Sequence, residues 1–379
     1  MPQYSTKLPE NFTGSTGLGT PTLTPPTQIT TSSTLNEILV FARAKNASDV
    51  HLSAQRPVIF RQFGQLKNIS EHTLSAEQVF ALISTLPQHL VQEFEKTGDG
   101  EYVHTIAGFG RFRMTLMRQR NGCDLTVRLV PLQIPKLEAI GMPASCVGLT
   151  KWAQGLVLVT GPAGSGKTTS LSALVELVNQ DRHDHIITIE QPIEIVYTPK
   201  QCQITQREVS THTLSQDNAL RAALREDPDI LVVSELRDLS TIQLAISAAE
   251  TGHLVFGTMN TVNAMQTISK LVDSFPAEDQ PIIRNMISES LRGVICQQLI
   301  PKKDGTGLVA AYEVLIVTPN IANLIREGKT AQINNAITTG KSAGMVLMDN
   351  SLEILAANGI ISTKDACDRA TSPTAVMQS

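Results

Sequence analysis

The sequence has few charged and few aromatic residues, and its cysteines form no close pair. Charged side chains make up 17% and aromatic ones 4% of the 379 residues, and the formal net charge is −4. No segment is rich in Lys and Arg, so we expect neither base stacking nor contacts along a phosphate backbone, and we predict no nucleic-acid partner. The five cysteines lie far apart without a CxxC pair, which indicates reduced thiols and excludes a tetracysteine zinc site.

The chain also lacks long apolar runs. No stretch approaches the roughly 18 consecutive apolar residues that a membrane span needs. The opening MPQYSTKLPENFTGSTGLGT contains no apolar targeting segment. We therefore expect a cytoplasmic protein without a membrane span, which reaches a membrane only through a partner.

Composition separates a tail from a first domain. Residues 1–33 are crowded with Thr, Ser and Pro and cannot bury enough apolar area to offset their ordering entropy, which predicts a disordered tail. Residues 34–133 mix short strands and helices, which predicts a small α+β domain. It begins with a helix capped by Thr34 and Glu37 and contains a hairpin that turns at Asn121–Gly122.

The second half of the chain has a different periodicity. After a proline-containing linker at 134–148, apolar runs such as GLVLVT, HIITIE, ILVVSE and HLVFGT alternate with helical stretches over 149–318. That alternation predicts βαβ units and a mostly parallel sheet covered by helices. Residues 319–379 are predicted to be a helical segment. The fold class is therefore α/β, with a smaller α+β domain first.

A P-loop lies in GLVLVTGPAGSGKTTS, between a predicted strand and a predicted helix. Gly161, Gly166, Lys167 and Thr168 satisfy its spacing. Glycines let backbone N–H groups close around a phosphate at a helix N-terminus. Lys167 is then expected to reach the β- and γ-phosphates of ATP, and the Thr168 hydroxyl to bind Mg²⁺. The predicted nucleotide-binding residues are Gly161, Pro162, Ala163, Gly164, Ser165, Gly166, Lys167, Thr168 and Thr169.

Two further strand ends carry acids. The apolar run of DPDILVVSELRD leads to Glu235, which we predict to be the Walker B acid that holds the water shell of the metal. HIITIEQPIE places Glu190 and Glu194 on either side of Pro192, and this spacing allows one of them to polarise the attacking water. A solvated acid without a role in catalysis is the alternative at these positions.

These motifs occur together with runs such as ASDVHLSA, RFRMTLMRQR, TIEQPIE, ELRDLSTIQLAISAAETGHLVFGT and NLIREGKTAQINNAITTGKSAGM. The combination resembles the PilT-type ATPases of type IV pili, within the larger family of type II and type IV secretion ATPases, over about residues 34–360. The resemblance implies a PAS-like N-terminal domain, a RecA-like ATPase domain and a homo-hexamer that binds ATP and Mg²⁺. It further implies that hydrolysis drives pilus retraction, and hence twitching motility, through a platform protein of the inner membrane.

The resemblance also implies roles for single residues. Glu194 matches the Asp-box glutamate that polarises water, and Glu235 matches the Walker B acid. Together with Lys167 they are the predicted catalytic residues. Thr168 and Glu235 are the predicted metal ligands.

Arginine fingers or phosphate sensors are a further implication of the resemblance, because guanidinium stays charged and binds phosphate oxygens bidentately. The candidates are Arg111, Arg113, Arg118, Arg207, Arg221 and Arg225. Arg113 and Arg221 are preferred. Helix capping, or pairing with acids such as Glu226 and Asp227, is the alternative for each.

Three positions depart from the family's pattern. The family's Asp box reads TIEDPIE where this chain has Gln191, and its Walker B motif has Gly where this chain has Ser234. The second histidine of its His box, TGHLVFGTLHT, is Asn260 here. A histidine can carry a proton near neutral pH, whereas an asparagine amide only donates and accepts hydrogen bonds. We predict a slower or differently coupled ATPase, in which Asn260 is a neutral substitute at a phosphate-sensing position and contacts nucleotide or Glu235.

The direction of the motor is predicted from a motif near the C-terminus and from domain content. The motif AIRNLIRE, tied to retraction in the PilT branch, reads NIANLIRE at 320–327, with Ala322 in place of an arginine. Retraction is preferred over assembly, because assembly ATPases usually carry an extra N-terminal domain and a tetracysteine zinc site. The alternatives are a weakly active or accessory ring subunit that works with a paralogous pilus ATPase, and a type II or type IV secretion ATPase on the same fold.

Overall fold

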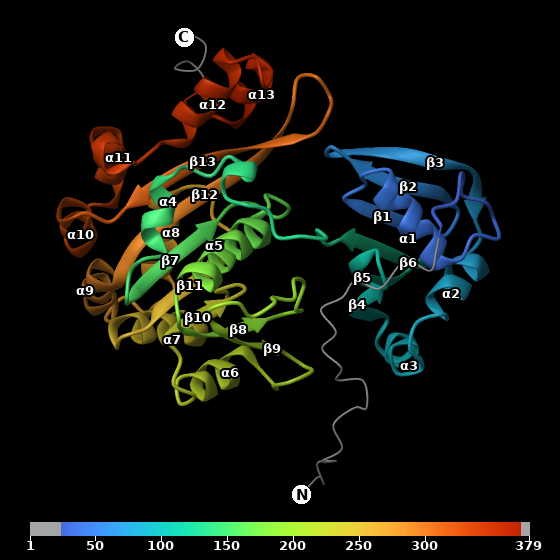
Figure 1. Ribbon diagram of the computed structural model, residues 1–379, viewed down its shortest axis with the longest axis horizontal. Coiled ribbons are helices and arrows are strands. Elements are labelled where there is room, and N and C mark those ends of the chain that lie inside the picture. The colour runs from blue at the N-terminus through green and yellow to red at the C-terminus, as the bar shows by residue number, and fades with distance from the viewer. Residues whose placement is uncertain (1–23, 373–379) are drawn as a thin grey trace, which may run out of the picture. The chain divides into compact units, whose positions relative to one another are not determined.

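The computed structural model describes residues 24–372, so most of the predicted disordered tail, residues 1–23, lies outside the described residues. The chain divides into two compact units (Figure 1). The first contains the residues up to Phe60 and Asn68–Leu132, and the second contains Arg61–Lys67 and the residues from Gln133 onward. Each unit has its own sheet and its own apolar core.

The first unit is built on a six-stranded sheet with the order β3-β2-β1-β6-β5-β4. Strand β6 pairs antiparallel with β1 and β5, and β5 pairs antiparallel with β4. The elements are α1 (Leu35–Ala44), β1 (Asp49–Ser53), β2 (Arg56–Gln62), β3 (Gln65–Leu74), α2 (Ala76–Ile83), α3 (Gln88–Thr97), β4 (Asp99–Ile106), β5 (Gly110–Gln119) and β6 (Gly122–Leu129).

Helix α1 begins where the sequence predicts. Thr34 Oγ1 accepts the main-chain N–H of Glu37 at 3.3 Å, and Glu37 Oε2 accepts the N–H of Thr34 at 2.8 Å. This reciprocal pair satisfies two N–H groups that would otherwise have no partner at the helix start. The capping box of α1 is confirmed.

The β5–β6 hairpin turns one residue earlier than predicted. Gln119 pairs with Gly122, so Arg120 and Asn121 form the two-residue loop. Gly122 therefore belongs to the strand, where a Cβ atom would lie 2.9 Å from the Cβ of Ala76. The glycine permits close packing of α2 against β6 and is not a central residue of the turn.

The second unit is built on a seven-stranded sheet with the order β13-β12-β7-β11-β10-β8-β9. All neighbours pair parallel except β12 and β13, which pair antiparallel. The elements are η1 (Glu138–Ile140), α4 (Ser145–Leu149), β7 (Gly155–Thr160), α5 (Lys167–Asp181), β8 (His185–Glu190), β9 (Gln203–Glu208), α6 (Gln216–Ala223), β10 (Ile230–Val233), α7 (Leu239–Glu250), β11 (Leu254–Met259), α8 (Ala264–Asp273), α9 (Gln280–Ser290), β12 (Leu291–Pro301), β13 (Leu308–Ile316), α10 (Pro319–Arg326), η2 (Thr330–Gln332), α11 (Ile333–Thr339), η3 (Gly340–Ala343), α12 (Met348–Ala357) and α13 (Thr363–Arg369).

Helices cover both faces of this sheet. Strands β7, β10 and β11 are buried at every residue, as expected for parallel strands between two helical layers. Leu156 and Leu158 of β7 share one core cluster with residues of α6, α7, α8 and α9. Helix α5, which lies along β7 in Figure 1, packs on β7 and β11 but contributes nothing to that cluster. It therefore covers the opposite face.

One buried carboxylate joins two helix starts in this unit. Glu313 of β13 is 3% exposed. Its Oε1 accepts the N–H of Ala264, the first residue of α8, at 2.7 Å, and its Oε2 accepts the N–H of Met348, the first residue of α12, at 3.2 Å. Negative charge is favourable at helix N-termini. Glu313 thus fixes α8 and α12 to the same strand.

Within the described part of the chain, every helix is too short or too polar to reach across a lipid bilayer.

Candidate nucleotide site

Four parallel strands end together at one edge of the second sheet. The register pairs Thr160 of β7 with Met259 of β11. It pairs Val233 of β10 with Gly257 of β11 and with Ile189 of β8. The loops that follow these four strands therefore start at neighbouring points, and they carry the P-loop, Asn260, Glu235 and Glu194. We call this side the phosphate edge.

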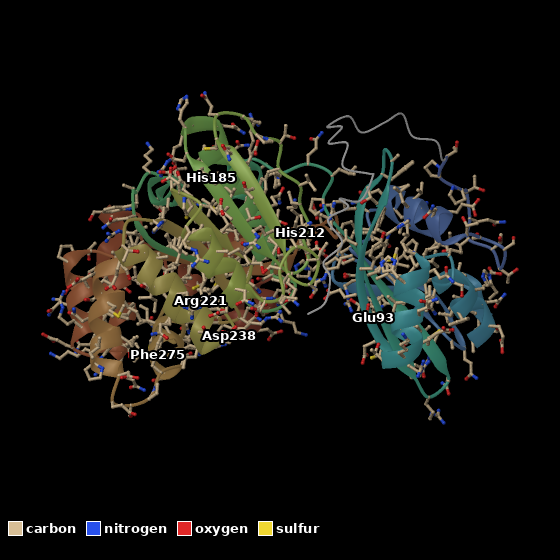
Figure 2. The ribbon with its side chains drawn as sticks, turned by 90° about the horizontal axis from the view of Figure 1, so that it is seen from below. Glu93, His185, His212, Arg221, Asp238 and Phe275 are labelled. Carbon is tan, nitrogen blue, oxygen red and sulfur yellow. The ribbon has the colours of Figure 1, made fainter. Side chains whose placement is uncertain are left out.

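Two histidines that are labelled in Figure 2 lie near opposite ends of the neighbouring strands β8 and β9. His185 begins β8, at the end opposite the phosphate edge. His212 lies just beyond β9, where its Nδ1 accepts the N–H of Glu208 at 2.9 Å. Strand β9 pairs parallel with β8, so its last residues also lie at the phosphate edge.

At two positions of the P-loop, Gly161 and Gly166, the backbone conformation and the close neighbours require glycine. Gly161 has φ 150° and Gly166 has φ 87°, both unfavourable for residues with a Cβ atom. A Cβ on Gly161 would lie 2.5 Å from Ser165 Oγ, and one on Gly166 would lie 2.9 Å from Gln297 Nε2. The loop is therefore closed tightly on itself and on β12.

The start of α5 is built to receive an anion. Gly166 caps the helix without any side-chain hydrogen bond to its first N–H groups. Lys167 Nζ donates to the carbonyl oxygens of Gly161 at 2.8 Å and Pro162 at 3.0 Å. The Ser165 hydroxyl is buried and has no hydrogen-bond partner. A helix N-terminus without a side-chain cap, a lysine folded over the loop and a buried hydroxyl without a hydrogen-bond partner fit the phosphate groups of a nucleotide.

The predicted binding residues differ in exposure along the loop. Gly161 and Ser165 are buried, Gly166, Lys167 and Thr169 are half-buried, and Pro162, Ala163, Gly164 and Thr168 are exposed. The Thr168 side chain is therefore accessible to a metal ion that arrives with the nucleotide.

Gln297 of β12 supports the P-loop, and sequence patterns did not indicate it. It is 3% exposed, and its Oε1 accepts a hydrogen bond from Ser170 Oγ of α5 at 2.5 Å. The two residues are 127 positions apart. No local pattern marks such a contact, because it depends on β12 lying next to β7.

Glu235 follows β10 and is held by two donors. Its Oε1 accepts from the Asn260 Nδ2 amide at 2.6 Å, and its Oε2 lies 2.6 Å from Arg237 Nη2. The Glu235 side chain is 23% exposed, so this carboxylate is accessible from solvent. Asn260 thus contacts the predicted Walker B acid. Arg237 was not singled out from the sequence, although it lies in the same ELRD motif.

Ser234, where the family has glycine, needs no special backbone. Its N–H donates to Ile189 O at 3.0 Å, and its carbonyl oxygen accepts from the Thr258 hydroxyl. These contacts join β10 to its neighbours β8 and β11. Ser234 is not among the described non-glycine residues with positive φ, which are Asn46, Gln55, Phe63, Ser210 and Asp227. A glycine is therefore not required there.

The two acids around Pro192 have different surroundings. Glu190 is 9% exposed, and its Oε1 accepts from Thr188 Oγ1 at 2.6 Å and from Gln206 Nε2 at 2.9 Å. Through these bonds the Glu190 carboxylate connects β8 to β9. Glu194 is half-buried on the loop that follows β8. Of the two, Glu194 is the better candidate for polarising water.

Within residues 24–372, no group of three or more His, Cys, Asp and Glu side chains could hold a metal ion. Mg²⁺ usually takes only one or two protein ligands and completes its shell with phosphate oxygens and water. The hydroxyl of Thr168 and the carboxylate of Glu235 have the right donor chemistry for a metal that binds together with ATP.

Three of the arginines that were predicted as fingers or phosphate sensors lie in the second unit, and their surroundings differ from one another. Arg221 of α6 (Figure 2) binds Asp217 through two bonds of 2.8 and 3.2 Å. These bonds hold the pKa of Asp217 below its usual range and raise the pKa of Arg221. Arg207 Nη2 lies 3.4 Å from the carbonyl oxygen of His212, a weak hydrogen bond. Arg225 is exposed.

The other three arginines lie on β5 of the first unit. Arg113 pairs with Glu101 of β4 at 2.5 Å, and Arg118 Nη2 donates to the carbonyl oxygen of Glu95 at 2.8 Å. The carbonyl oxygen of Arg111 accepts from Arg43 at 3.2 Å. Arg113 and Arg221, preferred from the sequence, therefore each have a carboxylate partner within their own unit. Their role as fingers stays a prediction.

A sequence model of the family described as type II/IV secretion system protein matches residues 27–366. The chain belongs to this family.

The secretion-family chain is similar to pilus ATPases along almost its whole length. It is 46% identical over 340 residues to the type IV pilus retraction ATPase PilT of Pseudomonas aeruginosa, covering 89% of this chain and 98% of PilT. It is 33% identical over 329 residues to the type IV pilus ATPase PilU of the same organism, covering 86% of each chain. Among solved structures, the pilus retraction motor PilT with bound ADP matches with a TM-score of 0.80 at 38% identity, covering 92% of this chain and 100% of that one.

These matches confirm the resemblance to PilT-type ATPases that the sequence motifs indicated. They also confirm the fold class, a RecA-like P-loop ATPase domain preceded by a smaller α+β domain. A relative of the same fold binds ADP, in agreement with the anion-binding features of the P-loop here.

Proposed function

We propose that this secretion-family ATPase hydrolyses Mg-ATP and drives retraction of a type IV pilus. In this proposal it works as a homo-hexamer in the cytoplasm and reaches the inner membrane through a platform protein. The observation that carries the proposal is the phosphate edge. A glycine-closed P-loop, an uncapped helix start and two acids lie there together, in a chain 46% identical to a retraction ATPase.

Each residue of the phosphate edge has a role that its position allows. Lys167 would exchange the carbonyl oxygens of the loop for the β- and γ-phosphate oxygens, and the first N–H groups of α5 would bind the phosphates. Thr168 and, through water, Glu235 would hold Mg²⁺, which neutralises charge on the phosphates. Glu194 would accept the proton of the attacking water.

Asn260 has a positioning role in this scheme. Its amide holds Glu235 Oε1 at 2.6 Å, and it does so at any working pH because an amide does not titrate there. A histidine at this position would bind the same carboxylate with a strength that depends on pH. The proposed enzyme therefore keeps the orientation of its Walker B acid but cannot sense protons at position 260.

A second candidate function is favoured by Gln191 and Asn260. A chain that differs from the family at these two positions fits an accessory subunit, which binds nucleotide weakly or slowly and shares a ring with a paralogous ATPase. PilU, the second type IV pilus ATPase similar to this chain, shows that one organism can hold two such proteins. A type II or type IV secretion ATPase on the same fold is the other alternative.

Phosphate release by the purified chain separates these functions. We expect turnover of Mg-ATP that Lys167→Ala abolishes. Lys151→Ala, an exposed lysine just after α4 at the opposite end of β7, should keep it. If the wild-type chain binds ADP but turns over no faster than Lys167→Ala, the motor proposal is wrong and the accessory role is favoured.

Complementation tests the direction of the motor. Expression in a strain of P. aeruginosa that lacks PilT should restore twitching on a surface if the chain retracts pili. Expression of Lys167→Ala is the matched control. A chain that hydrolyses ATP at a normal rate but restores no twitching, even with the host's own PilU present, would instead favour a secretion system.

A further inference from the structure

The loop that carries Glu194 is held by side chains of β9. The main-chain N–H of Ile193 donates to Glu208 Oε2 at 2.8 Å. This bond fixes the residue just before Glu194. Because the acceptor is a carboxylate, the bond is of the stronger, charge-assisted kind.

Gln206 holds the same loop on the other side of Glu194. Its Nε2 donates to the carbonyl oxygen of Ile195 at 2.9 Å, and its Oε1 accepts the N–H of Tyr197 at 2.9 Å. Glu194 therefore lies between backbone groups that are bound on both sides. The backbone at Glu194 can move little without breaking one of these bonds.

Buried and more exposed residues alternate along this loop, as they do in a β-strand. The loop is bound to β9 by side chains of that strand and not by its backbone. Every second residue is almost fully buried, each 8% exposed: Ile193, Ile195 and Tyr197. Glu194 and the 59% exposed Val196 occupy the alternate positions. Gln206 and Glu208 are two apart on β9 and so share one face of that strand. Their side chains take the place of a backbone ladder.

Both holding residues are themselves held. Gln206 Nε2 also donates to Glu190 Oε1 at 2.9 Å, at the end of β8. Glu208 Oε1 accepts from Thr211 Oγ1 at 2.7 Å, in the loop beyond β9. These bonds connect the two side chains to the end of β8 and to the loop beyond β9.

We propose that Gln206 and Glu208 are positioning residues for Glu194. They hold the loop so that the Glu194 carboxylate stays at the phosphate edge. The inference rests on the proposed function, in which Glu194 accepts the proton of the attacking water. Nucleotide binding should not depend on the pair, because the P-loop is supported by β7, α5 and β12.

Substitutions at position 208 separate positioning from bulk structure. Glu208→Ala leaves the N–H of Ile193 without its partner, and we expect kcat to fall by about tenfold or more. The KM for ATP and the affinity for ADP should stay within about twofold. Glu208→Gln should restore most of kcat, because its amide oxygen can accept from Ile193 while its NH₂ donates to the Thr211 hydroxyl.

Two further variants control this test. Thr211→Val removes the other hydrogen bond of the Glu208 carboxylate and leaves the bond to Ile193, so it should keep kcat near that of the wild type. Gln206→Leu has a similar volume but no polar group, and should lower kcat as Glu208→Ala does. It also serves as the test if Glu208→Ala does not fold.

Hydrogen exchange supplies a readout that needs no turnover. Residues 191–200 should exchange faster in Glu208→Ala and Gln206→Leu, while the P-loop peptide stays unchanged and Thr211→Val matches the wild type. Unchanged exchange at 191–200, wild-type kcat in both variants, or Glu208→Gln as impaired as Glu208→Ala would overturn the inference. A wild-type chain without turnover would instead refute the proposed function.

Discussion

Replacing Asn260 by histidine would introduce a titrating group beside Glu235. In the wild-type chain, an amide that neither gains nor loses a proton lies 2.6 Å from the Glu235 carboxylate. An imidazole there, with an ordinary pKa of about 6.5, would become a cation on the acidic side of neutrality. The charge of this position would then depend on pH.

The size of the effect follows from the surroundings of Glu235. Two opposite charges about 4 Å apart interact by roughly 4 kcal/mol at an effective dielectric constant of about 20. Solvent and the existing partner Arg237 screen most of this, because 23% of the Glu235 side chain is exposed. About 1 to 1.5 kcal/mol remains, which raises the imidazole pKa by about one unit, to between about 7 and 8.

The sign of the pH effect is set by competition for one carboxylate. Below its pKa the imidazolium binds Glu235 and draws it away from the metal's water shell, so turnover should be low. Above that pKa the neutral ring can hold the carboxylate only through one uncharged N–H, as the Asn260 amide does, and we expect turnover to rise toward that of the wild type.

Phosphate release at saturating Mg-ATP, measured between about pH 6 and 9, tests this reasoning. We expect a titration step in Asn260→His that is missing in the wild type. It should also be missing in Asn260→Gln, which keeps an amide. If the histidine variant has the rate and the pH profile of the wild type, position 260 is only a spacer.

Two predictions concern stability. Asn179 of α5 is 0% exposed and binds Thr198 O and the N–H of Lys200, each at 2.9 Å. Asn179→Ala should lower the free energy of unfolding in urea by about 2 to 4 kcal/mol, against about 0.5 for the exposed Gln180→Ala, and equal losses would contradict this. Burial raises the pKa of Glu313 above its ordinary value of 4.5, so the folded chain binds this proton more tightly than the unfolded chain does. Its contribution to stability is lost as pH rises from about 4.5 through the raised pKa, and the stability of the wild type relative to Glu313→Gln should fall over that range. If the difference in stability between the wild type and Glu313→Gln did not change with pH, the raised pKa of Glu313 would be refuted.

The sequence predicted the parts of the site that local patterns determine. The P-loop is a contiguous motif, and Glu235 follows a short apolar run of the kind that is typical of a buried strand. Parallel strands place their carboxyl ends at one edge, so the proximity of these loops also follows from the pattern. The capping box at Thr34 is local as well.

Contacts between distant residues could not be predicted. The bond between Asn260 and Glu235 joins positions 25 apart, and the pair Ser170–Gln297 joins positions 127 apart. Each depends on which strands are neighbours, and this order is not encoded in any short stretch. The antiparallel β12–β13 pair was missing from the prediction for the same reason. The spacing around Pro192 alone did not separate Glu190 from Glu194, and the choice of Glu194 came from the resemblance to the family.

The turn of the β5–β6 hairpin shows how a local signal can mislead. Asn-Gly is a strong signal for the centre of a two-residue turn, but Gly122 lies in the strand here. Its lack of a Cβ atom is used for packing against Ala76. A glycine can allow a tight turn or allow close packing. Which of the two applies depends on the residues that pack against it, here Ala76.

The carboxylate shared by α8 and α12 affects how deletions of the C-terminal helices should be interpreted. A chain cut before Met348 would lose one of the two helix starts that Glu313 holds, together with a helix that packs on β13. Because Glu313 also accepts the N–H of Ala264, which lies shortly after Asn260, the effect of the cut could extend to the phosphate edge. Lost activity in such a truncated chain would therefore not demonstrate the loss of a docking partner. Substitution of an exposed side chain on α12, such as the 58% exposed Ile354, would test for a docking partner without disturbing the phosphate edge.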